Sequence, residues 1–464
     1  MKKSRVLTDG NHFLSRFGTG IASYSRTLIH NIRDLGGTVG VLFGAKVSYG
    51  RHDGDLVLAT QILGHEPPPN ILVKALRTGG QLGRALLFPG RSIPARMVNM
   101  KGLEVDAFEP PLPTFDHVVS ASSVFVNADR VFTLTGKMTN IRLPDTFDVA
   151  HWSSPMPVRA EGVPNIYTIH DLIPLQYPYM VLDRGGRSAR LHASIAQSAD
   201  LIVTVSEASK RQIVDLLRVP EERVAVTFQP VPPLPFLTRE EAERLVRTVY
   251  GAKPGEYALF LGAIEPKKNL RRLVDAYLLA GLDTPLLIAG PLGWLYEEEL
   301  ALIDSVTRNA LPMRLPQQEG LANAIAGAFD MVAPQPRPNR LPIQRLGLLP
   351  RRHVSALMMC AKFFVFPSIH EGFGLPVLEA LQLGTPVLTS NTSSLPEVAG
   401  DAAVLVDPLD VSAMARRLRE LDGDADLRAE LSARGPQQAR TFSPETYKIK
   451  LADAYAKVGI TLSG

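Results

Sequence analysis

The chain has 464 residues, of which 45% are hydrophobic and 21% charged, a composition typical of a soluble globular protein with two or three domains. Its single cysteine, Cys360, excludes an internal disulfide and fits a reducing cytoplasm, and the absence of long apolar runs excludes a membrane-spanning helix. The net charge of +4 favours anionic partners, but no helix-turn-helix, zinc-finger or RNA-binding signature is present, so nucleic acid is not expected. The N-terminus lacks an apolar core, so we expect no signal peptide.

The first predicted strand–helix unit contains a glycine loop. Gly18, Thr19 and Gly20 follow a short apolar strand and precede a predicted helix over 22–34. Glycines before a helix N-terminus let backbone N–H groups approach a phosphate. The loop does not match the full dinucleotide-binding pattern, because Ser23 stands where the third glycine belongs and because the loop lies well clear of the strand. A flexible turn without a ligand remains the alternative.

A basic segment without any acidic residue extends over 67–103. Its lysines and arginines alternate with apolar residues, which is typical of a segment that lies on an anionic membrane surface. The alternative is a solvated pair of helices with one face in the core. Residues 105–145 show little periodicity, so no element is assigned there.

Two further predicted strands, 148–152 and 166–171, end in polar side chains. Parallel sheets bind ligands at the carboxyl ends of their strands, so His170 and Asp171 lie where chemistry is expected. Asp171 has a simpler alternative as the cap of the next turn. Ser206 is the expected N-cap of a later helix, and a cluster of prolines after residue 229 predicts a stiff interdomain linker.

The second predicted domain opens with a strand over 257–261, which is followed by Lys267 and Lys268 at a helix start. Two cations beside a helix N-terminus can bind a diphosphate, although a solvated lysine pair is the alternative. Residues 305–340 are rich in proline, include a candidate helix over 321–329 and are predicted to form a surface excursion of unknown function.

The most informative stretch is a strand, a glycine turn and a helix over 363–382. The apolar run Phe-Phe-Val-Phe predicts a buried strand, and Pro376 suits the first turn of the helix. The turn between them contains Gly372, Phe373 and Gly374. The helix N-terminus favours an anion, whereas the flanking carboxylates favour hydroxyls, so a nucleotide sugar is the ligand expected. A plain strand–turn–helix with solvated glutamates leaves the glycine turn unexplained.

The segment HEGFGLPVLEALQLGTPV resembles the donor-site signature of retaining glycosyltransferases of family 4, in which Glu371 and Glu379 would form the E-x7-E pattern. TIHDLIPLQYP, GAIEPKKNL and GPLGW resemble further elements of that family. The resemblance implies an α/β protein with the GT-B fold, in which two Rossmann-like domains face each other across a cleft. An acceptor-binding domain would cover 1–235, joined by the helix over 443–464, and a donor-binding domain would cover 236–442.

The resemblance also implies roles for the donor-site residues. Glu371 and the amides of the glycine turn would hold the transferred sugar, Leu375 would donate a backbone N–H to the phosphate, and Glu379 would bind the ribose hydroxyls. Lys268 matches the phosphate-binding lysine. The N-terminal glycine loop would approach the donor diphosphate and the acceptor.

The same resemblance gives expectations for four further positions. His170 would lie beside the donor sugar, with Asp171 next to it. Lys267 stands where arginine is usual, and Ala263 stands where some relatives have an arginine, so one phosphate contact is expected to be missing. We therefore expect His170, Glu371 and Lys268 to be the catalytic residues.

The predicted reaction is the retaining transfer of a hexose, mannose from GDP-mannose, to a saccharide or polyprenyl-diphosphate-linked acceptor in bacterial surface polysaccharide or glycolipid synthesis. It would pass through an oxocarbenium-like transition state. No cofactor and no catalytic metal are expected, because the lysine pair and the helix dipole would neutralise the leaving diphosphate. The D-x-D patterns at 53–55 and 422–424 are short enough to arise by chance, and the second is expected on an exposed turn between helices.

Three alternatives stay open at this point. A UDP- or dTDP-hexose could be the donor, the chain could be a nucleotide-sugar epimerase, or it could be a non-catalytic nucleotide-sugar-binding protein. The expected location is the cytoplasm, with peripheral contact of 67–103 at the inner face of the plasma membrane as an additional expectation.

Overall fold

The computed structural model describes residues 3–12, 20–44, 92–98, 113–144, 147–182, 186–230, 237–308 and 343–462. Gly18 and Thr19, the D-x-D pattern at 53–55, the candidate helix over 321–329 and most of 67–103 and 305–340 lie outside these ranges.

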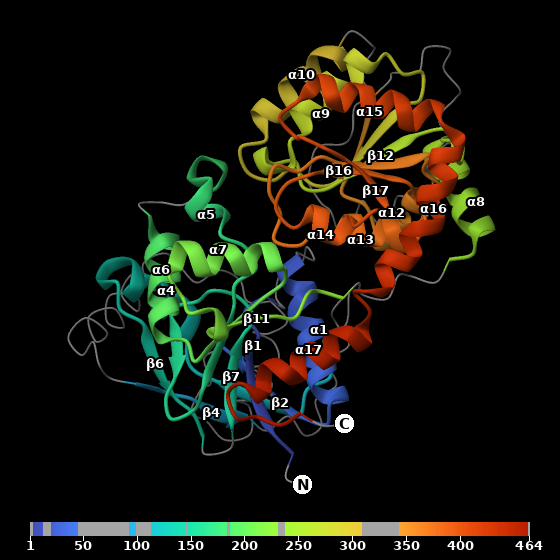
Figure 1. Ribbon diagram of the computed structural model, residues 1–464. Coiled ribbons are helices and arrows are strands. Elements are labelled where there is room, and N and C mark those ends of the chain that lie inside the picture. Colours follow the sequence, from blue (N-terminus) through green and yellow to red (C-terminus); the bar gives the residue numbers. More distant parts are fainter. Residues whose placement is uncertain are drawn as a thin grey trace. The chain divides into compact units, whose positions relative to one another are not determined.

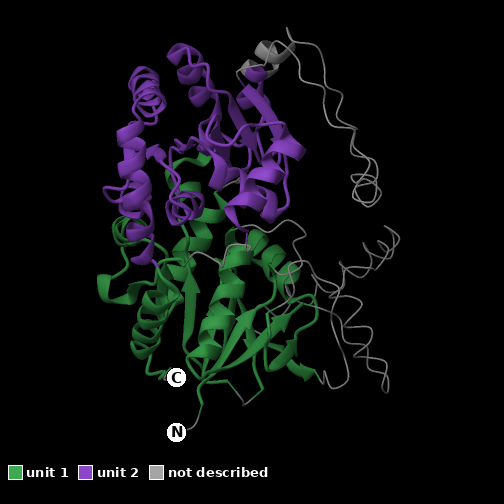
Figure 2. Ribbon diagram, turned by 90° about the vertical axis from the view of Figure 1, so that its right-hand side faces the viewer, with its two compact units in different colours: residues 1–178, 183–232, 443–464 green, residues 179–182, 233–442 purple. Residues whose placement is uncertain are grey.

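The chain divides into two compact units (Figure 2). Unit 1 consists of 1–178, 183–232 and 443–464, and unit 2 consists of 179–182 and 233–442. Unit 1 is therefore built from segments on both sides of unit 2 in the sequence. The acceptor and donor roles predicted for the two domains stay predictions.

The core of unit 1 is a largely parallel sheet. Its strands are β1 (Arg5–Asp9), β2 (Thr38–Phe43), β4 (Arg96–Val98), β5 (His117–Ser120), β7 (Val149–Trp152), β9 (Asn165–Thr168), β10 (Leu201–Thr204) and β11 (Val224–Val226). They lie in the order β11-β10-β9-β7-β1-β2-β5-β4, and within the described ranges only β4 pairs antiparallel to its neighbour. A second small parallel sheet contains β3 (Ile93–Pro94), β6 (Thr139–Arg142) and β8 (Val158–Ala160).

Helices cover both faces of the large sheet, which explains why its central strands β1, β7 and β9 are buried almost throughout. One face carries α4 (Val124–Thr135), α6 (Arg187–Ser198) and α7 (Glu207–Leu217), whose buried side chains join one core cluster with the strands. On the other face, α1 (Gly20–Asp34) packs beside α17 (Pro444–Ala456), the C-terminal helix (Figure 1). Unit 1 also contains the short helices α5 (Ile173–Gln176) and η2 (Glu221–Arg223), and η1 (Pro178–Met180) begins in unit 1 and continues into unit 2.

Unit 2 is a second doubly wound fold. Its strands are β12 (Ala258–Leu261), β13 (Leu286–Ala289), β14 (Ile343–Gly347), β15 (Phe363–Phe366), β16 (Val387–Ser390) and β17 (Ala403–Val406). They form a parallel sheet in the order β14-β13-β12-β15-β16-β17. Its helices are η3 (Pro266–Lys268), α8 (Arg239–Tyr250), α9 (Leu270–Ala280), α10 (Glu297–Arg308), α12 (Arg351–Cys360), α13 (Leu375–Gln382), α14 (Leu395–Ala399), α15 (Val411–Gly423) and α16 (Ala425–Arg440). Figure 1 shows α9 with α15 on one face of this sheet and α13 with α16 on the other.

Several local predictions are confirmed. Ser206 is the N-cap of α7, since its side chain accepts a hydrogen bond from the N–H of Ser209. Pro376 lies in the first turn of α13, and Cys360 is a free, fully buried thiol in the core. Within the described ranges, no helix combines the length and the apolar character needed to cross a membrane.

Other local predictions are wrong. The segment 105–145, whose sequence shows little periodicity, contains β5, α4 and β6. The helix α4 was hard to predict because Ser123 before it adopts a left-handed conformation and makes no side-chain cap. Of the basic segment, the described part 92–98 forms β3 and β4 rather than a helix. Of the second D-x-D pattern, Asp424 lies exposed between α15 and α16 as predicted, whereas Asp422 lies in the last turn of α15 and accepts a hydrogen bond from Lys362 Nζ at 2.5 Å.

Candidate functional site

The strand order of unit 2 creates a topological switch point between β12 and β15. From β12 the chain moves outward through β13 to β14, and from β15 it moves outward in the other direction through β16 and β17. Open parallel sheets bind ligands at such a point, beyond the carboxyl ends of the two central strands. The loop after β12 contains the lysine pair, and the loop after β15 contains the glycine turn. The fold therefore brings together two motifs that the sequence analysis identified separately.

Lys268 and Glu371 form a buried ion pair at this point. Lys268 Nζ donates to Glu371 Oε1 at 2.5 Å, and the two side chains are only 11% and 10% exposed. The Lys268 ammonium also lies 4.7 Å from the ring centroid of Phe366, the last residue of β15. Burial alone would raise the pKa of Glu371, but Lys268 and Lys267 together hold that pKa below its ordinary value. Glu371 is therefore a carboxylate at neutral pH.

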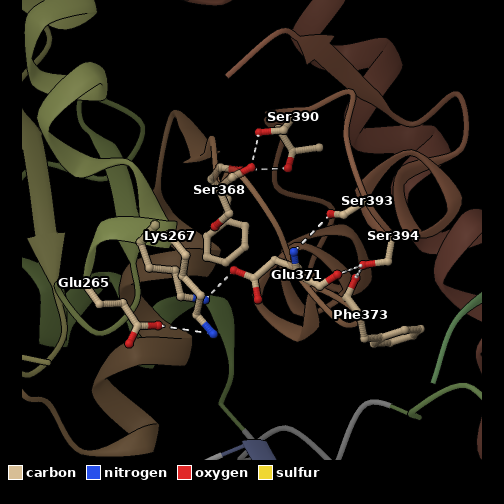
Figure 3. A network of polar contacts seen from close by, with 11 residues as sticks. Glu265, Lys267, Ser368, Glu371, Phe373, Ser390, Ser393 and Ser394 are labelled. Carbon is tan, nitrogen blue, oxygen red and sulfur yellow. Dashed lines mark hydrogen bonds and ion pairs between the residues drawn. The ribbon is translucent and has the colours of Figure 1, made fainter. Parts of the chain in front are cut away.

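A second acid–base pair lies beside the first. Lys267 Nζ is 3.4 Å from Oε1 of Glu265, a residue that is only 3% exposed (Figure 3). Burial raises the pKa of Glu265, and the neighbouring lysines oppose that rise. The Lys267 ammonium lies 5.9 Å from the ring centroid of Trp294. Glu265 is not among the site residues predicted from the sequence, although it belongs to the same motif as the two lysines.

Serine hydroxyls hold the glycine turn in place. The N–H of Glu371 donates to Ser393 Oγ at 3.0 Å, and Ser394 Oγ lies within hydrogen-bond distance of two carbonyl oxygens, 3.0 Å from that of Glu371 and 2.8 Å from that of Phe373 (Figure 3). Gly374 precedes α13 with φ of 109°, and a Cβ there would lie 2.7 Å from a methyl carbon of Leu395. The turn thus requires glycine at that position, and it places the N-terminus of α13 at the switch point.

Glu379 lies one turn further along α13 and is paired with a residue that the sequence analysis missed. Arg351 Nη2 at the start of α12 lies 3.1 Å from Glu379 Oε1, with the side chains 45% and 15% exposed. Burial raises the pKa of Glu379, and Arg351 opposes that rise. In the sequence, Arg351 is recognisable only as a basic residue at the start of a helix after β14. That position alone does not indicate that its partner is Glu379.

Unit 1 has its own switch point, between β1 and β7, and it is lined by polar side chains. Asp9 ends β1, is fully buried, and accepts a hydrogen bond from the N–H of Ser153 at 2.7 Å. Burial raises the pKa of Asp9, and nearby His12 is the main opposing influence. Asp9 is not among the residues predicted from the sequence, although it lies at the carboxyl end of a strand, where ligands are expected.

His170 is held in one orientation in the same region. Its Nε2 lies 2.9 Å from the carbonyl oxygen of Ser153. The rings of His170 and Tyr24 pack edge to face, with their centroids 4.7 Å apart. Because a carbonyl oxygen only accepts, Nε2 carries the proton and Nδ1 keeps the lone pair. Burial lowers the pKa of His170, so the ring is neutral at physiological pH.

A buried chain of hydrogen bonds connects strands β7 and β9 to the C-terminal helix. Tyr455 of α17 bonds to His151 Nδ1 at 2.8 Å, and His151 Nε2 bonds to Thr168 Oγ1 at 2.9 Å. Thr168 in turn bonds to the Tyr24 hydroxyl at 2.9 Å. Burial lowers the pKa of His151 to about 3, so this histidine is a neutral structural group.

The other predicted residues of unit 1 have local roles in the structure. The strand predicted over 166–171 ends at Thr168, and Asp171 Oδ1 accepts a hydrogen bond from the N–H of Ile173 at 3.0 Å. Asp171 therefore caps the turn that begins α5, as the simpler alternative predicted. Gly20 begins α1, and its carbonyl accepts a hydrogen bond from Gln229 Nε2 at 3.3 Å.

Comparison with known proteins agrees with this architecture. The model of the family "Glycosyl transferases group 1" matches residues 342–438, and that of "Glycosyltransferase Family 4" matches residues 101–233. O-antigen chain mannosyltransferase B of Escherichia coli is 35% identical over 297 residues, which cover 62% of this chain and 69% of the relative.

Two solved structures share the fold. Sucrose-phosphate synthase from Thermosynechococcus elongatus superposes with a TM-score of 0.60 at 14% identity, over 98% of this chain and 99% of the other. Anabaena Alr3699/HepE, solved in complex with UDP and glucose, gives 0.59 at 14% identity, over 98% and 99%.

Two Rossmann-like units of this kind form the GT-B fold. The chain belongs to the group 1 glycosyltransferases of family 4 and is a transferase enzyme.

Proposed function

We propose that this enzyme transfers mannose from GDP-mannose, with retention of configuration and without a metal, to a saccharide or lipid-linked acceptor in bacterial surface-polysaccharide synthesis. The observation that supports it most is the buried Lys268–Glu371 pair at the β12/β15 switch point, beside the N-terminus of α13. A cation and a helix N-terminus suit a diphosphate, and an ionised buried carboxylate suits sugar hydroxyls.

The choice of donor sugar rests on the relatives. The Escherichia coli relative is a mannosyltransferase of the O-antigen chain, which favours mannose and a polysaccharide product. Alr3699/HepE was solved with UDP and glucose, so a UDP-hexose is the second candidate donor. Both candidates place a nucleotide diphosphate at the same switch point.

In the proposed reaction, each site residue has a distinct task. Lys268 and Lys267 neutralise the negative charge that develops on the leaving diphosphate, so no metal is needed. Glu371 holds sugar hydroxyls, and its tight pairing with Lys268 makes it a poor nucleophile. His170, a neutral ring with a free lone pair on Nδ1, accepts a hydrogen bond from a hydroxyl. The acceptor proton passes to an oxygen of the departing diphosphate.

Calorimetric titration with GDP, UDP and dTDP in EDTA tests the donor. We expect GDP to bind most tightly, and Glu379→Ala to weaken that binding by about tenfold or more, because it removes a charged hydrogen-bond acceptor for the ribose. Tighter binding of UDP or dTDP would keep the fold and overturn the GDP assignment. No binding of any nucleotide by folded protein would contradict the transferase proposal at this site.

Hydrolysis of the sugar nucleotide separates an enzyme from a binding protein. Wild-type enzyme should slowly hydrolyse the donor that titration selects, and Glu371→Ala should not. Binding without any turnover in the wild type, with or without added acceptor saccharides, would favour a nucleotide-sugar-binding protein.

Arg351 should protect the ribose contact of Glu379 from protonation in mild acid. Burial already raises the pKa of Glu379, so Arg351→Met should raise it further and leave a protonated carboxyl as pH falls through that pKa. We expect the GDP affinity of the variant to match wild type at pH 8 and to be about threefold to tenfold weaker at pH 5.5, a modest effect because Arg351 is half-exposed. Arg352→Met is the matched control, since Arg352 pairs with Glu241 instead at 3.6 Å. Equal pH profiles for both variants would contradict this role.

A further inference from the structure

Four ionisable side chains share one buried cluster at the β12/β15 switch point. Glu265, Lys267 and Lys268 come from the segment after β12, and Glu371 comes from the loop after β15 (Figure 3). Two ammonium groups and two carboxylates give a net charge of zero when all are ionised. The two carboxylates therefore offset the charge of the two lysines, and the cluster as a whole adds no net charge to the attraction that the individual lysines and the N-terminus of α13 exert on a diphosphate.

The two carboxylates are not equally satisfied. Glu371 is hydrogen-bonded to Lys268 at 2.5 Å. Glu265 Oε1 lies 3.4 Å from Lys267 Nζ, beyond the usual length of a hydrogen bond. The other oxygen of Glu265, Oε2, is buried and has no hydrogen-bond partner among the described residues. A buried carboxylate with an unpaired oxygen favours its neutral form.

The surroundings of Glu265 offer it little further support as an anion. The charged groups that act on it are Lys267, Lys268 and Glu371, and the last of these repels it. From the loop after β13, Gly293 lies against Glu265, because a Cβ added to Gly293 would lie 3.2 Å from the Cβ of Glu265. Glu265 is therefore the member of the cluster that most easily accepts a proton.

We propose that Glu265 takes up one proton from solvent, on Oε2, when a nucleotide diphosphate binds, and that this releases Lys267 to contact the phosphates. This inference rests on the proposed function. The donor adds a negative charge on each phosphate next to Glu265, which makes the Glu265 anion less stable than before. The proton gives the cluster a net charge of +1, with Lys268 still paired to Glu371. Glu265 acts through the lysine and is a positioning residue rather than a catalytic one.

Proton uptake of this kind has a defined pH signature. Between the pKa of Glu265 in the free protein and its higher pKa in the complex, binding should consume up to about one proton per site. Across that window the affinity should weaken as pH rises, by up to about tenfold per pH unit. Replacement of Glu265 by glutamine should abolish this contribution, because the amide is neutral at every pH.

The test is calorimetric titration with GDP-mannose, or with UDP-glucose if the nucleotide titration selects UDP, between pH 6 and 9. At each pH, two buffers with different ionisation enthalpies give the number of protons taken up. We expect uptake in the wild type and none in Glu265→Gln, which should also bind more tightly than wild type at pH 8. Glu299→Gln is the matched control, since Glu299 is another buried glutamate with a raised pKa but lies in α10. It should take up protons as the wild type does.

The outcomes separate this inference from the proposed function. Binding without proton uptake, or equal uptake in Glu265→Gln and wild type, would overturn the role of Glu265 and leave the donor site intact. Absence of binding by folded wild type would overturn both. If Glu265→Gln does not fold, infrared difference spectra of the wild type decide the matter: a new carboxylic acid C=O band on nucleotide binding supports the inference, and its absence overturns it.

Discussion

Replacing Lys268 with methionine should abolish nucleotide binding and lower the free energy of unfolding by about 3–5 kcal/mol, the cost expected when one partner of a buried ion pair is removed. Its partner Glu371 would lose its 2.5 Å hydrogen bond and remain a buried carboxylate next to the apolar end of β15, with Lys267 as the other cation that acts on it. Urea denaturation measures the loss of stability, and calorimetric titration measures the loss of binding.

Two further variants separate charge pairing from ligand binding. The double variant Lys268→Met, Glu371→Gln removes both charges, so it should recover most of the stability but none of the binding. Lys362→Met breaks the Lys362–Asp422 pair in the same unit, with a contact of 2.5 Å and side chains 19% and 21% exposed. It should lose less stability and bind nucleotide normally. A Lys268→Met protein as stable as the wild type would contradict the importance of the buried pair.

Gly290→Ala should lower the free energy of unfolding more than the addition of a methyl group at any other described glycine near the site. Gly290 follows β13 with φ of 145°, and a Cβ there would lie 2.0 Å from the carbonyl oxygen of Gly262. Since that contact is with backbone, the ends of β12 and β13 must move apart, at a cost of more than about 3 kcal/mol. Displacement of the segment after β12 would also move the lysine pair, so nucleotide affinity should fall by about tenfold or more.

Gly281→Ala provides the matched control for this prediction. Gly281 ends α9 with φ of 63°, and a Cβ there would meet nothing within 4 Å. It therefore reports only the conformational cost of a left-handed alanine, about 1–2 kcal/mol. If urea denaturation gave Gly290→Ala and Gly281→Ala the same free energy of unfolding, the close approach of Gly290 to Gly262 would not contribute to stability.

The fold was predictable because its strongest signals are local. The run Phe363–Phe366 is buried on both faces, and a four-residue apolar run before a glycine turn is typical of a central parallel strand. The segment around α4 gave no such signal, since its first residues read Val-Phe-Val and interrupt the helical period. A helix start such as that of α7 depends on one capping side chain, Ser206, which can be recognised in the sequence.

The motifs of the site could be predicted from the sequence, but the ion pairs between their residues could not. Glu371 and Lys268 were each assigned from their own stretch of sequence, yet their direct contact depends on β12 and β15 being neighbours in the sheet. The same holds for Arg351 and Glu379, which come from different helices. Asp171 shows the converse, because its cap on Ile173 is a contact two residues away and the sequence analysis named it as an alternative.

The discontinuous construction of unit 1 has a consequence for how the chain folds during its synthesis. A ribosome releases the chain from the N-terminus, and domains generally fold as they emerge. Nearly all of unit 2 is one continuous segment, so it can be complete while unit 1 still lacks 443–464. Until α17 emerges, His151 has no Tyr455 hydroxyl and the face of the sheet beside α1 stays uncovered. The first unit to be started is thus the last to be finished, and the nascent chain exposes apolar sheet surface for the whole time that unit 2 is being translated.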